Sequence, residues 1–72
     1  MMKDKLQILD VVALLAYLPG EPVQPGQIGT IVEELGDSAY EVEFADGQGR
    51  PITICAIEAN QLLKLTHELV MS

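Results

Sequence analysis

The stretch PGQIGTIVEEL, from Pro25 to Leu35, contains the strongest indication of the fold. Two glycines precede a run of β-branched and apolar residues, and such runs favour strands. We therefore predict a strand over 28–34, entering a small β-barrel. Gly29 lies within this strand, where a glycine is typical of a bulge or of a close approach between backbones. We expect a bulge, because the strands of a small barrel must bend to close; a glycine that admits a ligand is the alternative.

Three further strands are predicted downstream. The segments LGDSA (35–39) and ADGQGR (45–50) have the composition of hairpin turns. Between them, YEVEF (40–44) alternates, which predicts its three apolar side chains in the core and its two glutamates in water. The last strand is LLKL (62–65), and IEANQ (57–61) before it predicts one helical turn.

The remaining predicted strand, PITICA (51–56), lies between these two and also alternates. We expect Ile52, Ile54 and Ala56 to face inward, and Thr53 and Cys55 to lie on the opposite face. Pro51 suits the first position of a strand, because proline has no N–H to donate there.

The N-terminal segment is ambiguous. Its apolar residues have helical spacing over 7–18, but the composition of DVVALLAYL also suits a strand that is buried on both faces. The next segment, LPGEPVQPG (18–26), must be a loop, since it contains three of the four prolines. If both faces of DVVALLAYL are apolar, the outer face needs a cover: the tail residues LVM, a partner or a second copy of the chain. We therefore also predict self-association.

Charge limits the classes of partner. The chain has 72 residues and a net charge of −7, from eleven acidic residues against four Lys and Arg. Nucleic-acid binding requires cations that displace phosphate counterions, so no nucleic acid and no membrane surface is expected as a partner. The same field attracts a basic protein.

The acidic residues of the second hairpin form the candidate binding patch. One of Glu33 and Glu34 is expected to face Glu41 and Glu43 across the ladder, with Asp37 in the turn. The simpler interpretation of the patch is a solvated sheet face that also discourages edge-to-edge pairing. The functional interpretation is a surface for a basic protein partner, and a weak cation site is the remaining alternative. The loop residues Tyr17, Pro22 and Val23 are the candidate apolar anchors.

No residues indicate catalysis, a metal site or a cofactor. Cys55 is the only cysteine and His67 the only histidine, and the sequence supplies no positive charge to stabilise a thiolate. We expect a small apolar Cys on a strand and an exposed His in the tail. No export signal or membrane-spanning run is apparent, so we expect a cytoplasmic protein.

The order of LDVVALL, GQIGTIVEEL, YEVEFADGQG and AIEANQLLKL resembles a group of small bacterial proteins known only as a domain of unknown function. For that group an SH3-like barrel is expected. The resemblance implies a strand over 10–15, a long first loop at the prolines and a short helical turn over 58–61. It implies no activity.

We therefore predict a single domain over 1–72, with frayed ends at 1–6 and 67–72. Its fold is an all-β, five-stranded SH3-like barrel with one short helical turn before the last strand. The predicted function is a non-catalytic protein-interaction module that regulates or neutralises a basic partner. The alternative, by fold analogy alone, is a nucleic-acid- or ribosome-associated barrel.

Overall fold

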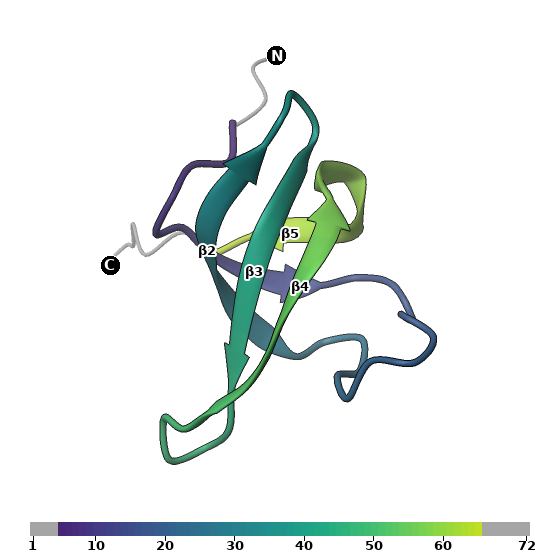
Figure 1. The fold of residues 1–72 in the computed structure, drawn as a ribbon, viewed down its shortest axis with the longest axis vertical. Helices are drawn as coiled ribbons and strands as arrows, with labels where there is room; N and C mark the ends of the chain where they lie inside the picture. Colours follow the sequence, from purple (N-terminus) through teal and green to yellow (C-terminus); the bar gives the residue numbers. More distant parts are fainter. Residues whose placement is uncertain (1–4, 66–72) are drawn as a thin grey trace, which may run out of the picture.

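The computed structural model describes residues 5–65, which form one antiparallel sheet of five strands (Figure 1). A 3-10 turn, η1, precedes the last strand. The prediction of an all-β fold with five strands and one helical turn is therefore confirmed. No helix in this part of the chain is long and apolar enough to cross a membrane. The elements are β1 (Val11–Leu14), β2 (Ile28–Leu35), β3 (Ala39–Ala45), β4 (Pro51–Glu58), η1 (Ala59–Gln61) and β5 (Leu62–Lys64).

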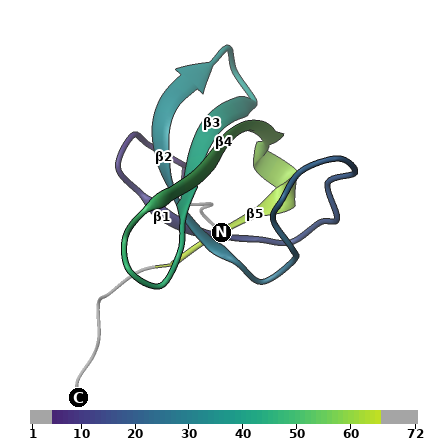
Figure 2. The same ribbon diagram turned by 60° about the horizontal axis from the view of Figure 1, so that its bottom comes forward.

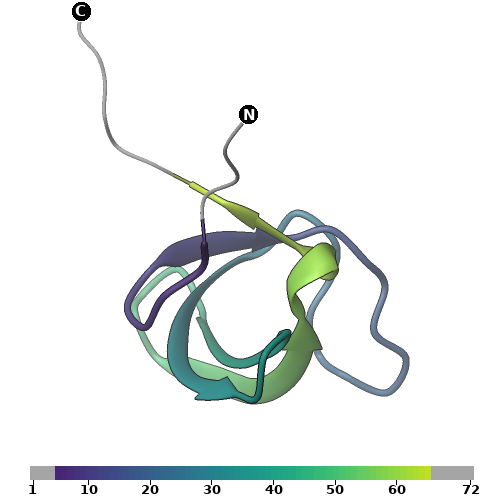
Figure 3. The same cartoon turned by 90° about the horizontal axis from the view of Figure 1, so that it is seen from above.

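The strand order in the sheet is β4-β3-β2-β1-β5. Strands β2, β3 and β4 follow one another as hairpins. Strand β1 pairs with the edge of β2 that faces away from β3, and β5 pairs with the other edge of β1. The first and last strands are thus neighbours (Figure 2). Seen from above, the sheet curls around a common centre, so the fold is barrel-like (Figure 3).

The ambiguous N-terminal segment is a strand, as the resemblance implies, and not a helix. Val12 and Leu14 are buried, whereas Val11 and Ala13 on the alternate face are partly exposed. Ile8 and Leu15, which a helix would place on its buried stripe, are about half exposed. Pairing with β2 and β5 on both sides satisfies the backbone of this segment, so tertiary pairing overrides its helical periodicity.

The predicted orientation of β4 is wrong. Cys55 and Ile57 face the core, whereas Ile52 and Ile54 are 37% and 54% exposed. The register explains this orientation, because residues directly opposite in a ladder share a face of the sheet. Cys55 lies opposite Val42, and Ile57 lies opposite Tyr40 (paired in the same ladder).

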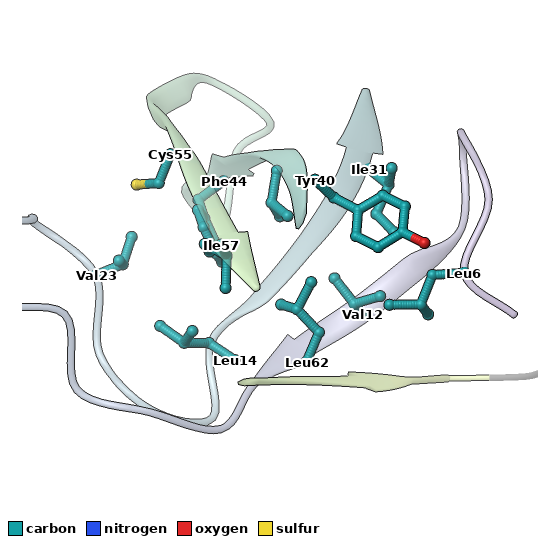
Figure 4. Packing of buried hydrophobic residues seen from close by; sticks show 11 residues of the cluster. Leu6, Val12, Leu14, Val23, Ile31, Tyr40, Phe44, Cys55, Ile57 and Leu62 are labelled. Carbon is teal, nitrogen blue, oxygen red and sulfur yellow. The ribbon is translucent and has the colours of Figure 1, made fainter. Parts of the chain in front are cut away.

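The core contains side chains from every strand and from two segments outside the strands (Figure 4). Tyr40, Val42 and Phe44 all face it, as predicted for β3. Leu6, which we placed in a frayed end, is buried as well; the other predicted frayed residues lie largely outside the described range. Val23 of the proline-rich loop is also buried. The full core is Leu6, Val12, Leu14, Val23, Ile31, Tyr40, Val42, Phe44, Cys55, Ile57 and Leu62.

Gly29 is a site of close approach, not the predicted bulge. A Cβ atom built on it would lie 2.6 Å from Val42 Cγ1 and 2.9 Å from Phe44 Cε1. The register shift in the β2–β3 ladder comes later, between Ile31 and Glu33. Glycine is thus needed at this position because β3 side chains fill the space where another side chain would begin.

Both hairpin turns occur where the sequence predicts them. Gly36 and Gly49 have φ values of 77° and 83°, which favour glycine. In the second turn, the Asp46 carboxylate accepts hydrogen bonds from the backbone N–H groups of Gln48 and Arg50 at 2.8 and 2.9 Å. These two hydrogen bonds stabilise the charged carboxylate and so lower the pKa of Asp46, and the bond from Arg50 has the larger effect.

Candidate functional site

Three glutamates of the β2–β3 hairpin gather on the outer face of the sheet. Glu33 lies directly opposite Glu41, and Glu43 lies two residues from Glu41 on β3. Glu33 is exposed, and the two β3 glutamates are partly buried. We call these three residues the acidic face. Like charges this close across a ladder oppose pairing by up to about 1 kcal/mol, so the arrangement lowers stability.

The register shift in β2 is what places Glu33 in the acidic face. Before the shift, Ile31 lies opposite Val42; after it, Glu33 lies opposite Glu41. Without the extra residue, Glu33 would lie opposite the buried Tyr40 and its side chain would point to the other face. The bulge therefore directs a carboxylate outward, which is a use often found at functional surfaces.

The remaining predicted acids lie elsewhere. Glu34 is exposed near the end of β2, opposite Tyr40. Asp37, in the turn, lines an open hollow of about 740 Å³ whose lining includes Tyr40, Leu62 and Lys64. The structure therefore divides the five predicted acids into the acidic face and two outlying residues.

The three predicted anchors differ in exposure. Tyr17 is 71% exposed and Pro22 is also exposed, so both remain accessible to a partner. Val23 is only 2% exposed. Its side chain lies near Leu14 and Cys55 in the core (Figure 4). The choice of Val23 as an anchor is therefore corrected: this residue attaches the proline-rich loop to the barrel.

Sequence reasoning missed the apolar residues beside the acidic face. Ile54 lies directly opposite Glu43, and Ala56 lies opposite Glu41, on the outer surface of β4. Ile54 is more than half exposed. The only available signal was that PITICAI contains apolar residues in both phases of a strand, so that one apolar set had to remain outside.

Cys55 does not have the environment of a nucleophile. Its Sγ donates a hydrogen bond to Glu21 Oε1 at 3.4 Å, and the side chain is buried. Burial, and then the Glu21 carboxylate, raise the pKa of the thiol. A reactive cysteine needs the opposite shift. His67, its only candidate base, lies outside the described residues. Within 5–65, no group of three His, Cys, Asp or Glu side chains has a geometry that would hold a metal ion.

A second outward patch bears on self-association. Ala13 of β1 lies between Ile28 of β2 and Leu63 of β5. Ile28 and Leu63 are each about half exposed, so the outer surface at β1 is apolar. Self-association stays a prediction, and sedimentation that shows only a monomer at every concentration would remove it.

Comparison with known proteins identifies a family. A family model described as "Domain of unknown function (DUF4926)" matches residues 8–64. No curated protein and no solved structure matches the chain. The match covers every strand of the sheet and confirms the resemblance to a domain of unknown function.

Proposed function

Because the chain belongs to this family, DUF4926, whose description gives no activity, we propose a function from the surface of the fold. We propose that the chain is a non-catalytic interaction module, an SH3-like barrel, whose acidic face binds a basic protein and thereby regulates or neutralises it. The observation that carries this proposal is the gathering of Glu33, Glu41 and Glu43 on one outward surface.

None of the three cations in residues 5–65 forms an ion pair with that surface, and Lys5 lies at the hollow that Asp37 also lines. Arg50 Nε pairs with Asp46 at 3.1 Å, in the β3–β4 turn. Lys64 Nζ pairs with Asp10 at 3.5 Å, beside β1. The acidic face therefore keeps its charge, and a cationic partner would relieve the repulsion between its members. Relief of this kind adds to the steering that the net charge of −7 supplies.

The test compares two charge-matched double variants in binding to heptalysine at low salt, measured by calorimetry. E41Q/E43Q removes two members of the acidic face, and E34Q/D37N removes the two outlying acids. Exposed ion pairs contribute about 0.2–1 kcal/mol each, so we expect E41Q/E43Q to weaken binding by about fivefold. E34Q/D37N should change it by less than about twofold.

Equal weakening by both variants would contradict the proposal, because it would mean that only net charge matters. Gel-shift experiments with single- and double-stranded RNA and DNA address the competing function. Clear binding at low salt would favour a nucleic-acid-associated barrel instead.

A further inference from the structure

Strand β4 has one open edge. It is the terminal strand in the order β4-β3-β2-β1-β5 and pairs only with β3. It has eight residues, whereas the other terminal strand, β5, has three. Sheet edges attract further strands unless they are short or carry lysine, proline or a bulge. Beyond Pro51 and the register shift near Ala45, the rest of β4 has none of these features.

The ladder shows which backbone groups point to the open edge. Ala59 N–H donates to Ser38 O at 2.8 Å. Hydrogen-bonded and non-hydrogen-bonded pairs alternate in an antiparallel ladder, so Cys55 and Ile57 exchange bonds with β3. The N–H and C=O groups of Ile54 and Ala56 therefore point away from β3. In the described part of the chain, no backbone hydrogen bond outside the β3–β4 ladder reaches them.

The side chains at this edge would complement an added strand. Ile54 and Ala56 are exposed on the outer surface, and each lies beside a glutamate of β3. Neighbouring strands lie about 4.8 Å apart, so a lysine or arginine on an added strand can cover Ile54 with its stem and place its charge near Glu43. Besides Glu43 of β3, the exposed Glu58 of β4 itself offers a carboxylate to such a side chain.

From this juxtaposition we propose that the open edge of β4 binds an extended basic segment of a partner protein as a sixth strand. The inference rests on the proposed function and names its mode of binding. Backbone bonds to Ile54 and Ala56 supply affinity, and outward Lys or Arg side chains at alternate positions supply specificity. A second copy of this chain suits the edge poorly, because two chains that each carry a net charge of −7 repel each other.

The test uses an octapeptide of alternating lysine and valine, with a peptide of the same composition in two blocks as its control. Binding is followed by amide chemical shifts. Ala56→Pro removes an edge donor but leaves the β3 ladder intact, because the Ala56 N–H points away from β3. We expect the alternating peptide to bind A56P at least about tenfold more weakly, from the lost bond and the clash with the proline ring. Heptalysine, which needs only charge, should bind A56P as well as the unaltered chain.

A second variant keeps the test decisive if A56P does not fold. Ile54→Ser removes the exposed apolar contact and keeps the backbone N–H, so we expect about threefold weaker binding of the alternating peptide. In the unaltered chain, the Ile54 and Ala56 amides should exchange with solvent at least about tenfold more slowly when the peptide is bound.

The outcomes separate the two proposals. If the alternating peptide binds A56P or I54S as well as the unaltered chain but binds E41Q/E43Q more weakly, edge binding is overturned and the proposed role of the acidic face remains. If its binding to E41Q/E43Q is unchanged as well, both proposals are overturned. Protection of Ile54 and Ala56 that increases with protein concentration alone would identify a second copy as the occupant and overturn the inference.

Discussion

Replacement of Gly29 by alanine tests how closely β2 and β3 pack. The new Cβ would lie 2.6 Å from Val42 Cγ1, 2.9 Å from Phe44 Cε1 and 3.0 Å from the Glu43 carbonyl oxygen. Ordinary contacts need 3.4–4 Å, so both side chains would have to move. Neither can retreat into solvent, because Val42 and Phe44 are both 0% exposed.

The expected cost follows from this geometry. Overpacking a well-packed core costs about 1–3 kcal/mol. We expect about 3 kcal/mol here, because two buried side chains and one backbone atom surround the same methyl group. A chain of this size has a free energy of unfolding of roughly 4–11 kcal/mol, so the loss is a large fraction of it. In a domain this small, the midpoint of thermal unfolding should fall by about 10–20 °C.

Urea unfolding followed by far-ultraviolet circular dichroism measures the effect. Gly47→Ala is the matched control, since nothing lies within 4 Å of a Cβ at that position and its φ is not positive. It should change the free energy of unfolding by less than about 0.5 kcal/mol. The double variant G29A/V42A should lose at least about 1 kcal/mol less than the sum of its single variants, because truncation of Val42 makes room for the new methyl group.

Two results would refute the reasoning. A free energy of unfolding for G29A within about 0.5 kcal/mol of that of the unaltered chain would mean that β2 and β3 move apart to accommodate the methyl group at no cost. Strict additivity in the double variant would mean that the loss comes from the backbone of residue 29 and not from its contact with Val42.

Three further predictions concern the loop, the thiol and the second turn. Val23→Ala should lower the free energy of unfolding by about 1–2 kcal/mol in urea titrations, because a loop residue fills part of the core. The pKa of Cys55 is raised above its ordinary value of 9.0, so its ionisation favours the unfolded chain. The free energy of unfolding, measured by urea titration, should therefore fall as the pH rises above 9.0. It should fall less over that range in the Cys55→Ala variant. The Gln48 and Arg50 amides both donate to the Asp46 carboxylate, so Asp46→Ala should accelerate hydrogen exchange at these two amides. Asp46→Asn keeps an acceptor oxygen and should accelerate it less.

The sequence predicts β2 and β3 well because each pattern there has one reading. Over residues 40–44 of β3, apolar and charged residues alternate strictly, so only one face suits the core. In β1, the helical and extended readings both fit the spacing, and the sequence alone did not separate them. The pairing of Val12 with Gly29 and Lys64 separates them, and this pairing depends on residues far away in the chain.

The error in β4 has a similar origin. Apolar residues occupy both phases of PITICAI, so alternation does not choose between them. The choice depends on the ladder with β3, where Cys55 and Ile57 lie opposite Val42 and Tyr40. A shift of one residue reverses every side chain of a strand, and no local feature of β4 reports its register. The acidic face has the same dependence, since the bulge in β2 decides that Glu33 and not Glu34 joins it.

The misassigned strand is also the strand that the proposed binding mode uses, and the two facts have one physical cause. A solvated edge strand whose only task is to close the sheet is best served by polar residues on its outer face. Strand β4 instead exposes Ile52 and Ile54, and Ile54 lies directly opposite Glu43 of β3. Exposed β-branched residues next to unpaired backbone groups favour aggregation unless a partner covers them. Failure of a simple pattern at a single strand is therefore itself an argument for function at that strand.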